Sequence, residues 1–229
     1  MNSAIIVAAG TGTRFSGDAA KQFVDLAGKP LLAHTLEKFQ RCEYVDEIVL
    51  VLSADAVSSV DRYLDAGAFP KLTAVVAGGP TRAQSVFNGL EAVDSSCEIV
   101  AIHDAARPFV TEVDIGLVLA SARKSGAACL VRQVYDTIKR VAGGNIVETL
   151  DRSNLRRAQT PQAFEIRLLR QAFENELLDE SVTDECSLVE RIGIHISIIE
   201  GNSRNIKITT KEDLRLAEAI LRVETENND

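Results

Sequence analysis

The sequence predicts an α/β fold in which helices cover both faces of a mostly parallel β-sheet. Three observations lead to this prediction. Short apolar segments alternate with longer segments of helical spacing over roughly the first 130 residues. The apolar segments lack polar alternation, as expected of strands that are buried on both faces. Strands and helices alternate in the order that builds parallel sheets, and 229 residues suffice for one domain with a sizeable core.

The expected strands are brief and rich in Val, Ile and Ala. They cover Ser3–Ala9, Glu47–Ser53, Leu72–Gly78, Glu98–Asp104 and Gly126–Arg132. The segments between them have helical spacing and predict helices over Leu31–Arg41, Ala54–Gly67, Thr81–Val93 and Thr111–Gly126. Thr81 and Thr111 are expected to cap the N-termini of two helices. Gly67 and Gly126 are expected to end two helices.

The pattern changes after Arg132. Polar and apolar residues alternate around a Gly-Gly-Asn turn at Gly143–Asn145, which predicts a β-hairpin. A hairpin inserted in an α/β domain is either a lid over the site or an arm that reaches a second subunit. We predict one domain over residues 1–229 with a β-arm at about residues 134–157. The remaining elements are expected to be helices over Ile166–Leu178 and Asp184–Arg191, strands over residues 194–201 and 205–209, an amphipathic helix over residues 211–224, and a frayed tail.

Composition narrows the class of protein. The formal charge of −8 gives no general affinity for nucleic acid or an anionic membrane. No apolar run reaches about 18 residues and no secretion signal is recognisable, so we expect a cytoplasmic protein. The four cysteines form no C-x-x-C pair and are expected to be buried free thiols: Cys42, Cys97, Cys129 and Cys186.

The first candidate for a ligand site is the stretch "IIVAAGTGTRF" at Ile5–Phe15. Gly10 and Gly12 match two glycines of the dinucleotide fingerprint, but Phe15 stands at the third position, and no P-loop motif is present. A glycine loop at the carboxyl end of a strand, with Arg14 inside it and Lys21 after it, suits phosphate binding. A tight turn with two solvated cations is the alternative.

Two further segments follow expected strands. In "AGGPTRAQSV" a base or ribose could pack against Gly79, with Ser85 donating to the base edge; an ordinary strand–turn–helix connection is the alternative. In "IHDAARPFV" the position of Asp104 suits a divalent cation that bridges phosphates. Alternatively, Asp104 caps a turn and pairs with Arg107.

The remaining polar residues carry weaker signals of a site. His34, His103 and His195 are interpreted as satisfied core histidines rather than ligands, because no other His or Cys lies at ligand spacing. Hydroxyl and cationic side chains gather late in the sequence, and a phosphorylated polyol would need such groups. They are Thr137, Lys139, Arg152, Thr160, Thr183 and Lys207. Each of them alone reads as a solvated surface residue.

Taken together, seven motifs in order resemble the cytidylyltransferases of the non-mevalonate isoprenoid pathway, which act on 2-C-methyl-D-erythritol 4-phosphate. The motifs are "AAGTGTRF…KQF…GKP", "AGGPTRAQSV", "HDAARPFV", "DTIKR", "LDRSNLRRAQTPQAF", "VTDECSLVE" and "EGNSRNIKITTKEDL". The resemblance implies a Rossmann-like nucleotide-diphospho-sugar transferase fold. It also implies a homodimer in which the β-arm clasps the partner and each active site is shared.

The resemblance further implies roles for individual residues. The loop binding CTP would contain Ala8, Ala9, Gly10, Thr11, Gly12, Arg14 and Lys21, with Gly79 and Ser85 at the cytosine. Asp104, Ala105 and Ala106 would lie near the ribose, and Asp104 would bind Mg²⁺ or another divalent cation. The polyol phosphate would contact Asp104, Arg107, Thr160, Thr183 and Lys207, with Thr137 and Arg152 of the arm. Thr13 and Pro80 depart from variants of the family that carry an arginine and an acidic residue there.

The implied reaction is in-line attack of the substrate phosphate on the α-phosphorus of CTP, with Arg14, Lys21 and Lys207 as catalytic residues. Since a phosphate monoester is already anionic at neutral pH, the reaction needs no general base. The alternatives are a cytidylyltransferase for ribitol 5-phosphate or another pentitol phosphate, a nucleotidyltransferase using UTP or GTP, and a non-catalytic nucleotide-binding regulator on the same fold.

Overall fold

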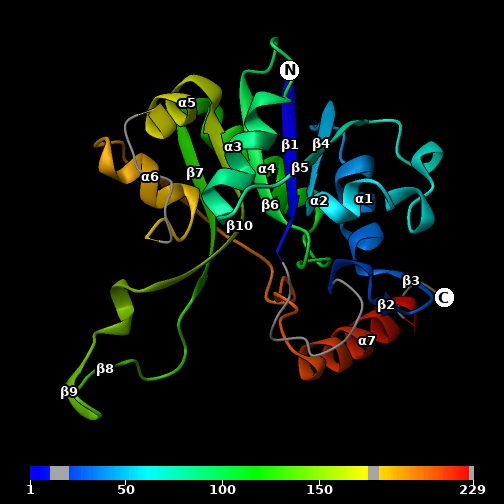
Figure 1. Ribbon diagram of the computed structural model, residues 1–229. Helices are drawn as coiled ribbons and strands as arrows, with labels where there is room; N and C mark the ends of the chain where they lie inside the picture. Colours follow the sequence, from blue (N-terminus) through cyan, green and yellow to red (C-terminus); the bar gives the residue numbers. More distant parts are fainter. Residues whose placement is uncertain (11–20, 175–180, 227–229) are drawn as a thin grey trace.

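A seven-stranded sheet forms the centre of the molecule in the computed structural model, which describes residues 1–10, 21–174 and 181–226 (Figure 1). Its strand order is β11-β7-β10-β6-β1-β4-β5. Strand β10 runs antiparallel to both of its neighbours, while the other pairings in this sheet are parallel. The prediction of a mostly parallel sheet is therefore confirmed. The strands are β1 (Asn2–Ala8), β4 (Glu47–Leu52), β5 (Leu72–Ala77), β6 (Ile99–Asp104), β7 (Ala127–Gln133), β10 (Arg156–Glu165) and β11 (Ser197–Glu200).

Helices cover both faces of the sheet, as predicted. Helices α1 (Leu31–Arg41) and α4 (Glu112–Ser125) share one buried apolar cluster with Ile6 of β1. Ile5, the next residue of β1 in the direction of the N-terminus, belongs to the opposite cluster because successive strand side chains point to opposite faces. The helices packed in that second cluster are α3 (Arg82–Glu91), α5 (Ile166–Glu174) and α6 (Glu185–Arg191).

The predicted helix ends are largely confirmed. The hydroxyl of Thr81 accepts the N–H of Gln84 and caps α3, and Thr111 caps α4 in the same way. Gly126 ends α4 with a φ of 85°, a left-handed conformation that glycine adopts without strain.

The C-terminal helix α7 (Lys211–Glu226) packs on a separate small layer. Its Ala217 shares a cluster with Leu26 of the two-stranded ribbon β2 (Asp25–Leu26) and β3 (Lys29–Pro30). Ile208, in the segment that leads into α7, is fully buried in the same cluster. This packing fixes the segment that carries Lys207.

The predicted hairpin is present. Strands β8 (Lys139–Ala142) and β9 (Asn145–Thr149) pair antiparallel and extend away from the body of the molecule (Figure 1). Gly143 and Gly144 turn the chain with φ values of 56° and 79°. A 3₁₀ turn, η5 (Arg152–Asn154), leads the chain back to the sheet. Val141 and Ile146 are exposed on this arm.

The helix predicted over Ala54–Gly67 is wrong. The segment instead contains α2 (Ala54–Val57) and the 3₁₀ turns η3 (Val60–Arg62) and η4 (Ala66–Ala68), so Gly67 does not end a helix. The hydroxyls of Ser58 and Ser59 both donate to the carbonyl of Asp55. Such local bonds compete with the backbone bonds of a helix and explain the break.

The strand predicted over residues 205–209 is also wrong, because the segment pairs with no neighbouring strand among the described residues. The N–H of Ile208 donates to the carbonyl of Ala106 in the turn after β6, and the N–H of Thr209 donates to the side chain of Asp213. The carbonyl of Asn205 accepts hydrogen bonds from Arg107 and Gln159. Conversely, β10 was missed as a central strand, since Pro161 at its middle argues against one. The structure accommodates Pro161 at a register irregularity between Ala158 and Gln162.

The burial of the cysteine and histidine side chains agrees with the predictions except at His195. All four cysteines are buried and free, as predicted. His34 and His103 are buried and hydrogen-bonded, whereas His195 is exposed and is not a core residue. Among the described residues, no helix is long and apolar enough to cross a membrane.

Candidate functional site

A pocket of about 610 Å³ lies at the carboxyl ends of the parallel strands. In open α/β sheets this edge is where ligands bind, and the volume is that of a small-molecule site. Its walls come from the segments that follow β1, β4, β5 and β6, with one side closed by the segment before α7. The described lining residues are Val7, Ala8, Ala9, Gly10, Gln22, Ser53, Ala54, Gly78, Gly79, Pro80, Thr81, Arg82, Ser85, Asp104, Ala105, Ala106, Lys207 and Thr209.

Two glycines let one wall of the pocket form. A Cβ atom on Gly78 would lie 2.4 Å from the Cβ of Ala9, so only glycine lets the turn after β5 approach the loop after β1. The N–H of Gly79 donates to the hydroxyl of Ser85 at 3.1 Å, and that hydroxyl lies 2.9 Å from the carbonyl of Thr81. The hydroxyl of Ser85 therefore holds the turn, and it can meet a base edge only by sharing these bonds.

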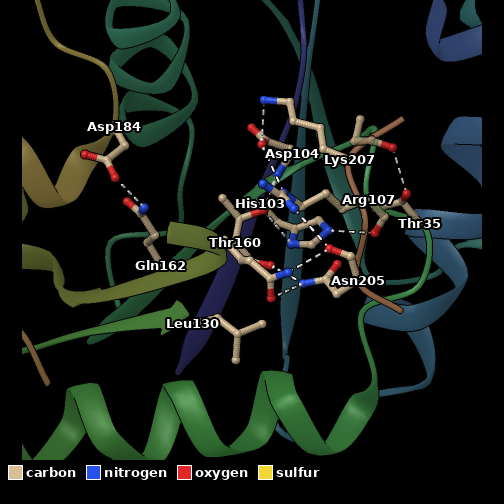
Figure 2. Close-up of polar contacts among 12 residues, drawn as sticks. Thr35, His103, Asp104, Arg107, Leu130, Thr160, Gln162, Asp184, Asn205 and Lys207 are labelled. Carbon is tan, nitrogen blue, oxygen red and sulfur yellow. Dashed lines mark hydrogen bonds and ion pairs between the residues drawn. The ribbon is translucent and has the colours of Figure 1, made fainter. Parts of the chain in front are cut away.

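Charge concentrates around Asp104, the last residue of β6. The Nζ of Lys207 lies 2.8 Å from Asp104 Oδ2, and Arg107 Nε lies 3.4 Å from the same oxygen (Figure 2). Arg82 Nη2 lies 3.5 Å from Asp104 Oδ1. Burial by itself would raise the pKa of Asp104, but Arg82 and Lys207, helped by Arg107, hold it well below its usual range. Asp104 is therefore ionised, and three cations surround it.

A buried network beneath the pocket fixes the backbone of Asp104. The hydroxyl of Thr160 accepts the N–H of Asp104 at 3.0 Å and lies 3.1 Å from Nδ1 of His103 (Figure 2). The Nε2 of His103 lies 3.1 Å from the carbonyl of Arg107. Burial lowers the pKa of His103 to about 4, so the ring is neutral at pH 7. The neutral ring links Thr160 to Arg107 without adding charge.

Asn205 fixes the segment that carries Lys207. Its side chain is fully buried, and its amide nitrogen donates to the carbonyl of Thr160 at 2.9 Å. Its own carbonyl accepts from Arg107 Nη1 at 3.0 Å (Figure 2). The same carbonyl accepts from Gln159 Nε2, also at 3.0 Å. These bonds join the segment before α7 to β10 and to the turn after β6.

The structure brings many of the predicted site residues together. Those that line the pocket are Ala8, Ala9, Gly10, Gly79, Ser85, Asp104, Ala105, Ala106 and Lys207. Thr11, Gly12, Arg14 and the side chain of Lys21 lie outside the described residues. The backbone of Lys21 begins the 3₁₀ turn η2 (Lys21–Phe23), whose Gln22 lines the pocket.

The other predicted residues do not line the pocket. Thr160 and Arg107 lie beneath it in the buried network. Thr183 is exposed in the turn before α6. Thr137 and Arg152 lie on the arm, where Arg152 donates to the carbonyl of Tyr135.

The side chains that line the pocket decide whether it could bind a divalent cation. Asp104 is the one carboxylate among the described lining residues, and the described part of the chain has no cluster of three or more His, Cys, Asp or Glu side chains able to hold a metal. Mg²⁺ bound with nucleotides usually takes one or two carboxylates and completes its shell with phosphate oxygens and water. The residues therefore fit a cation held mainly by the ligand's own phosphates.

The ion pair between Arg82 and Glu185 was not predicted from the sequence. Arg82 lines the pocket, and its Nη1 donates to Glu185 Oε1 at 2.6 Å across 103 positions of sequence. Glu185 lies in the quoted motif "VTDECSLVE", but no local pattern links it to Arg82.

Comparisons with known proteins agree with this geometry. Residues 2–223 match the family model described as IspD: 2-C-methyl-D-erythritol 4-phosphate cytidylyltransferase. The curated protein of that name from Halalkalibacterium halodurans is 42% identical over 220 residues, covering 96% of each chain. The one from Geobacillus kaustophilus is 45% identical over 219 residues, covering 95% of this chain and 96% of the relative.

Solved structures are similar as well. The 4-diphosphocytidyl-2C-methyl-D-erythritol synthase of Anaerococcus prevotii matches with a TM-score of 0.84 and 33% identity over 96% of each chain. The 2-C-methyl-D-erythritol 4-phosphate cytidylyltransferase of Thermus thermophilus matches with a TM-score of 0.76 and 33% identity, covering 97% of this chain and all of that one.

Proposed function

The chain belongs to the 2-C-methyl-D-erythritol 4-phosphate cytidylyltransferase family, and from that premise we propose how its own residues carry out the reaction. The enzyme transfers CMP from CTP to 2-C-methyl-D-erythritol 4-phosphate and releases pyrophosphate. The observation that carries the proposed mechanism is the cluster of Arg82, Arg107 and Lys207 around Asp104 at the strand edge of the pocket.

The mechanism is in-line attack of the substrate phosphate on the α-phosphorus of CTP. Because the nucleophile is already an anion, the protein needs to align the reacting groups and neutralise charge rather than remove a proton. Lys207 is placed beside Asp104 with a side chain that is 40% exposed, so it is able to meet an incoming phosphate. In this proposal Arg14 and Lys21 act on the triphosphate, and the backbone of Ala8, Ala9 and Gly10 borders it.

Asp104 would hold a divalent cation together with the phosphate oxygens of CTP. When bound, Mg²⁺ would neutralise charge on the triphosphate and help pyrophosphate to leave. Ionised Asp104 suits this role, since its pKa lies well below the usual range.

We also propose that two chains form a homodimer through the β-arm, each being one domain with an arm. The support is the exposed apolar surface of the hairpin, including Val141, Ile146 and Val147, which a single chain leaves in water. Thr137 and Arg152 would then reach the partner's pocket. Deleting residues 138–150 is expected to give a monomer in size-exclusion chromatography with light scattering, and a deletion protein that remains a dimer would contradict the clasp.

Four buried free cysteines suit a reducing environment, and we propose a cytoplasmic location on that basis.

Pyrophosphate release tests the substrate assignment. The purified protein is incubated with Mg²⁺, each nucleoside triphosphate and a panel of polyol phosphates. We expect signal with CTP and 2-C-methyl-D-erythritol 4-phosphate only. Turnover with ribitol 5-phosphate in its place would favour the pentitol phosphate enzyme, and no turnover in any combination would favour the nucleotide-binding regulator.

A further inference from the structure

Arg82 is held between two carboxylates at the wall of the pocket. It is the first residue of α3, and its Nη1 donates to Glu185 Oε1 at 2.6 Å. Its Nη2 lies 3.5 Å from Asp104 Oδ1. The Arg82 side chain is 26% exposed while that of Glu185 is fully buried. Arg82 also lines the pocket, and its guanidinium lies between the carboxylates of Glu185 and Asp104.

Glu185 prevents Arg82 from leaving this position. A fully buried carboxylate needs its cation, because an unpaired charge in the interior is strongly destabilising. The second oxygen, Glu185 Oε2, has no hydrogen-bond partner among the described residues. Burial raises the pKa of Glu185 above its ordinary value, and Arg82 is the main group that opposes this shift and favours the charged carboxylate. Burial would lower the pKa of Arg82, but the carboxylates of Glu185 and Asp104 raise it. The guanidinium is therefore both charged and fixed in place.

The position of the pair argues for a role beyond folding. A buried ion pair is often no more stabilising than apolar side chains of the same volume. This one places a planar, multiply donating cation beside Asp104, on the carboxylate oxygen that Lys207 does not contact. Arg82, Arg107 and Lys207 meet at this end of the pocket, and Asp104 and Glu185 are their ion-pair partners.

We propose that Arg82 is a further phosphate-binding residue of this active site and that Glu185 is the positioning residue that fixes it. The proposal rests on the proposed function, because it takes the phosphates of CTP and of the polyol phosphate as the ligands. A phosphoryl group at Asp104 would lie between a fixed guanidinium and the more exposed ammonium of Lys207. The fixed cation requires no reorganisation during the reaction, which is the condition for effective electrostatic catalysis.

Kinetics of three variants test the proposal. Glu185→Gln keeps the size of the side chain but removes its charge. Arg82→Met removes the guanidinium, and the double variant removes both charges, so that no buried charge is left unpaired. We expect Glu185→Gln to lower kcat/KM by about tenfold and Arg82→Met by about a hundredfold or more. In the Arg82→Met background, Glu185→Gln should have no further effect, because Glu185 acts through Arg82.

A matched control separates positioning from stability. Arg123 pairs with Glu98 at the same distance, 2.6 Å, but both side chains are exposed and neither lines the pocket. Arg123→Met is expected to leave kcat and both KM values unchanged. Chemical rescue provides a readout that a structural role would not give: guanidinium ion added at millimolar concentration should restore part of the activity of Arg82→Ala and none of that of Lys207→Ala.

The outcomes are distinct. Wild-type kinetics in Glu185→Gln would overturn the positioning role, and so would a Glu185→Gln effect that persists in the Arg82→Met background. If a single variant fails to fold, the double variant still decides whether the guanidinium matters, since near-normal turnover by it would overturn the whole proposal. Failure of the proposed function would appear in the wild-type enzyme as no pyrophosphate release, whereas failure of this inference appears in the variants alone.

Discussion

Replacing Asn205 with alanine tests whether the buried amide network controls both stability and the placement of Lys207. The substitution removes the donor to the carbonyl of Thr160, which lies 2.9 Å from Asn205 Nδ2, and a longer contact of 3.5 Å to Gln159 Oε1. The backbone carbonyl of Asn205 remains, so the hydrogen bonds from Arg107 and Gln159 can persist.

The expected loss of stability follows from the carbonyl of Thr160, which loses the hydrogen bond from the Asn205 side chain. Thr160 is only 3% exposed, and a buried carbonyl without its donor costs about 1–3 kcal/mol. The contact to Gln159 at 3.5 Å is too long to add much. We therefore expect the free energy of unfolding to fall by about 1–3 kcal/mol. Because the segment holding Lys207 is loosened as well, kcat should fall on the order of tenfold.

Urea denaturation monitored by circular dichroism gives the stability change, and pyrophosphate release gives kcat. Asn202→Ala is the matched control in the same segment. Within the described part of the chain its side chain accepts one hydrogen bond, from the exposed N–H of Arg204, and losing it should cost less than about 0.5 kcal/mol. An Asn205→Ala protein as stable and as active as the Asn202→Ala protein would refute the reasoning.

Three further predictions concern other parts of the molecule. Lys21→Ala should lower kcat on the order of 10²-fold with an unchanged melting temperature, and near-normal turnover would remove Lys21 from the mechanism. Gly78→Ala places a Cβ atom 2.4 Å from that of Ala9 and 2.7 Å from Ser85 Oγ, so the KM for CTP should rise about tenfold, which steady-state kinetics would check. Burial lowers the pKa of His34 below 6.5, so the unfolded chain binds the proton more readily and stability is lost as the pH falls below 6.5. Urea titrations at pH 7.5 and 5 should show a smaller acid loss in His34→Gln than in wild type, and equal losses would contradict the buried neutral ring.

The parts of the fold that sequence predicted well are those whose signal is local. The apolar run that forms β1 and the caps at Thr81 and Thr111 depend on neighbouring residues only. Strand β10 depends on partners between 23 positions (Arg156 to Gln133) and 66 positions (Glu165 to Ile99) away, and its central proline indicates a loop locally. The segment at residues 205–209 has the composition of a strand, but distant side chains from Arg107 and Gln159 occupy its first carbonyl.

The residues of the candidate site likewise fall into those with a local sequence signal and those that depend on distant partners. Residues that follow buried strands, such as Ala9, Gly79 and Asp104, were predictable because strand ends gather at one edge of a parallel sheet. The structure corrects the expected environment of Thr160, whose hydroxyl supports Asp104 and His103 beneath the pocket. Neither this support nor the Arg82–Glu185 pair has a sequence signature, because each joins residues that meet only in the folded chain.

Buried carboxylates allow several cations to gather at this pocket. The protein carries a formal charge of −8, yet its ligands are expected to bring several phosphate charges to one end of a sheet. Cations gathered there would repel one another without counter-ions, and Asp104 and Glu185 supply these from within the fold. Asp104 lines the pocket, where a divalent cation can compete for its carboxylate and a phosphate for its cationic partners. Glu185 is fully buried and binds Arg82 on the side away from Asp104. The two carboxylates thus give the cations different roles. Lys207, paired with Asp104, can turn toward a ligand, whereas Arg82, paired with Glu185, is held in a fixed position.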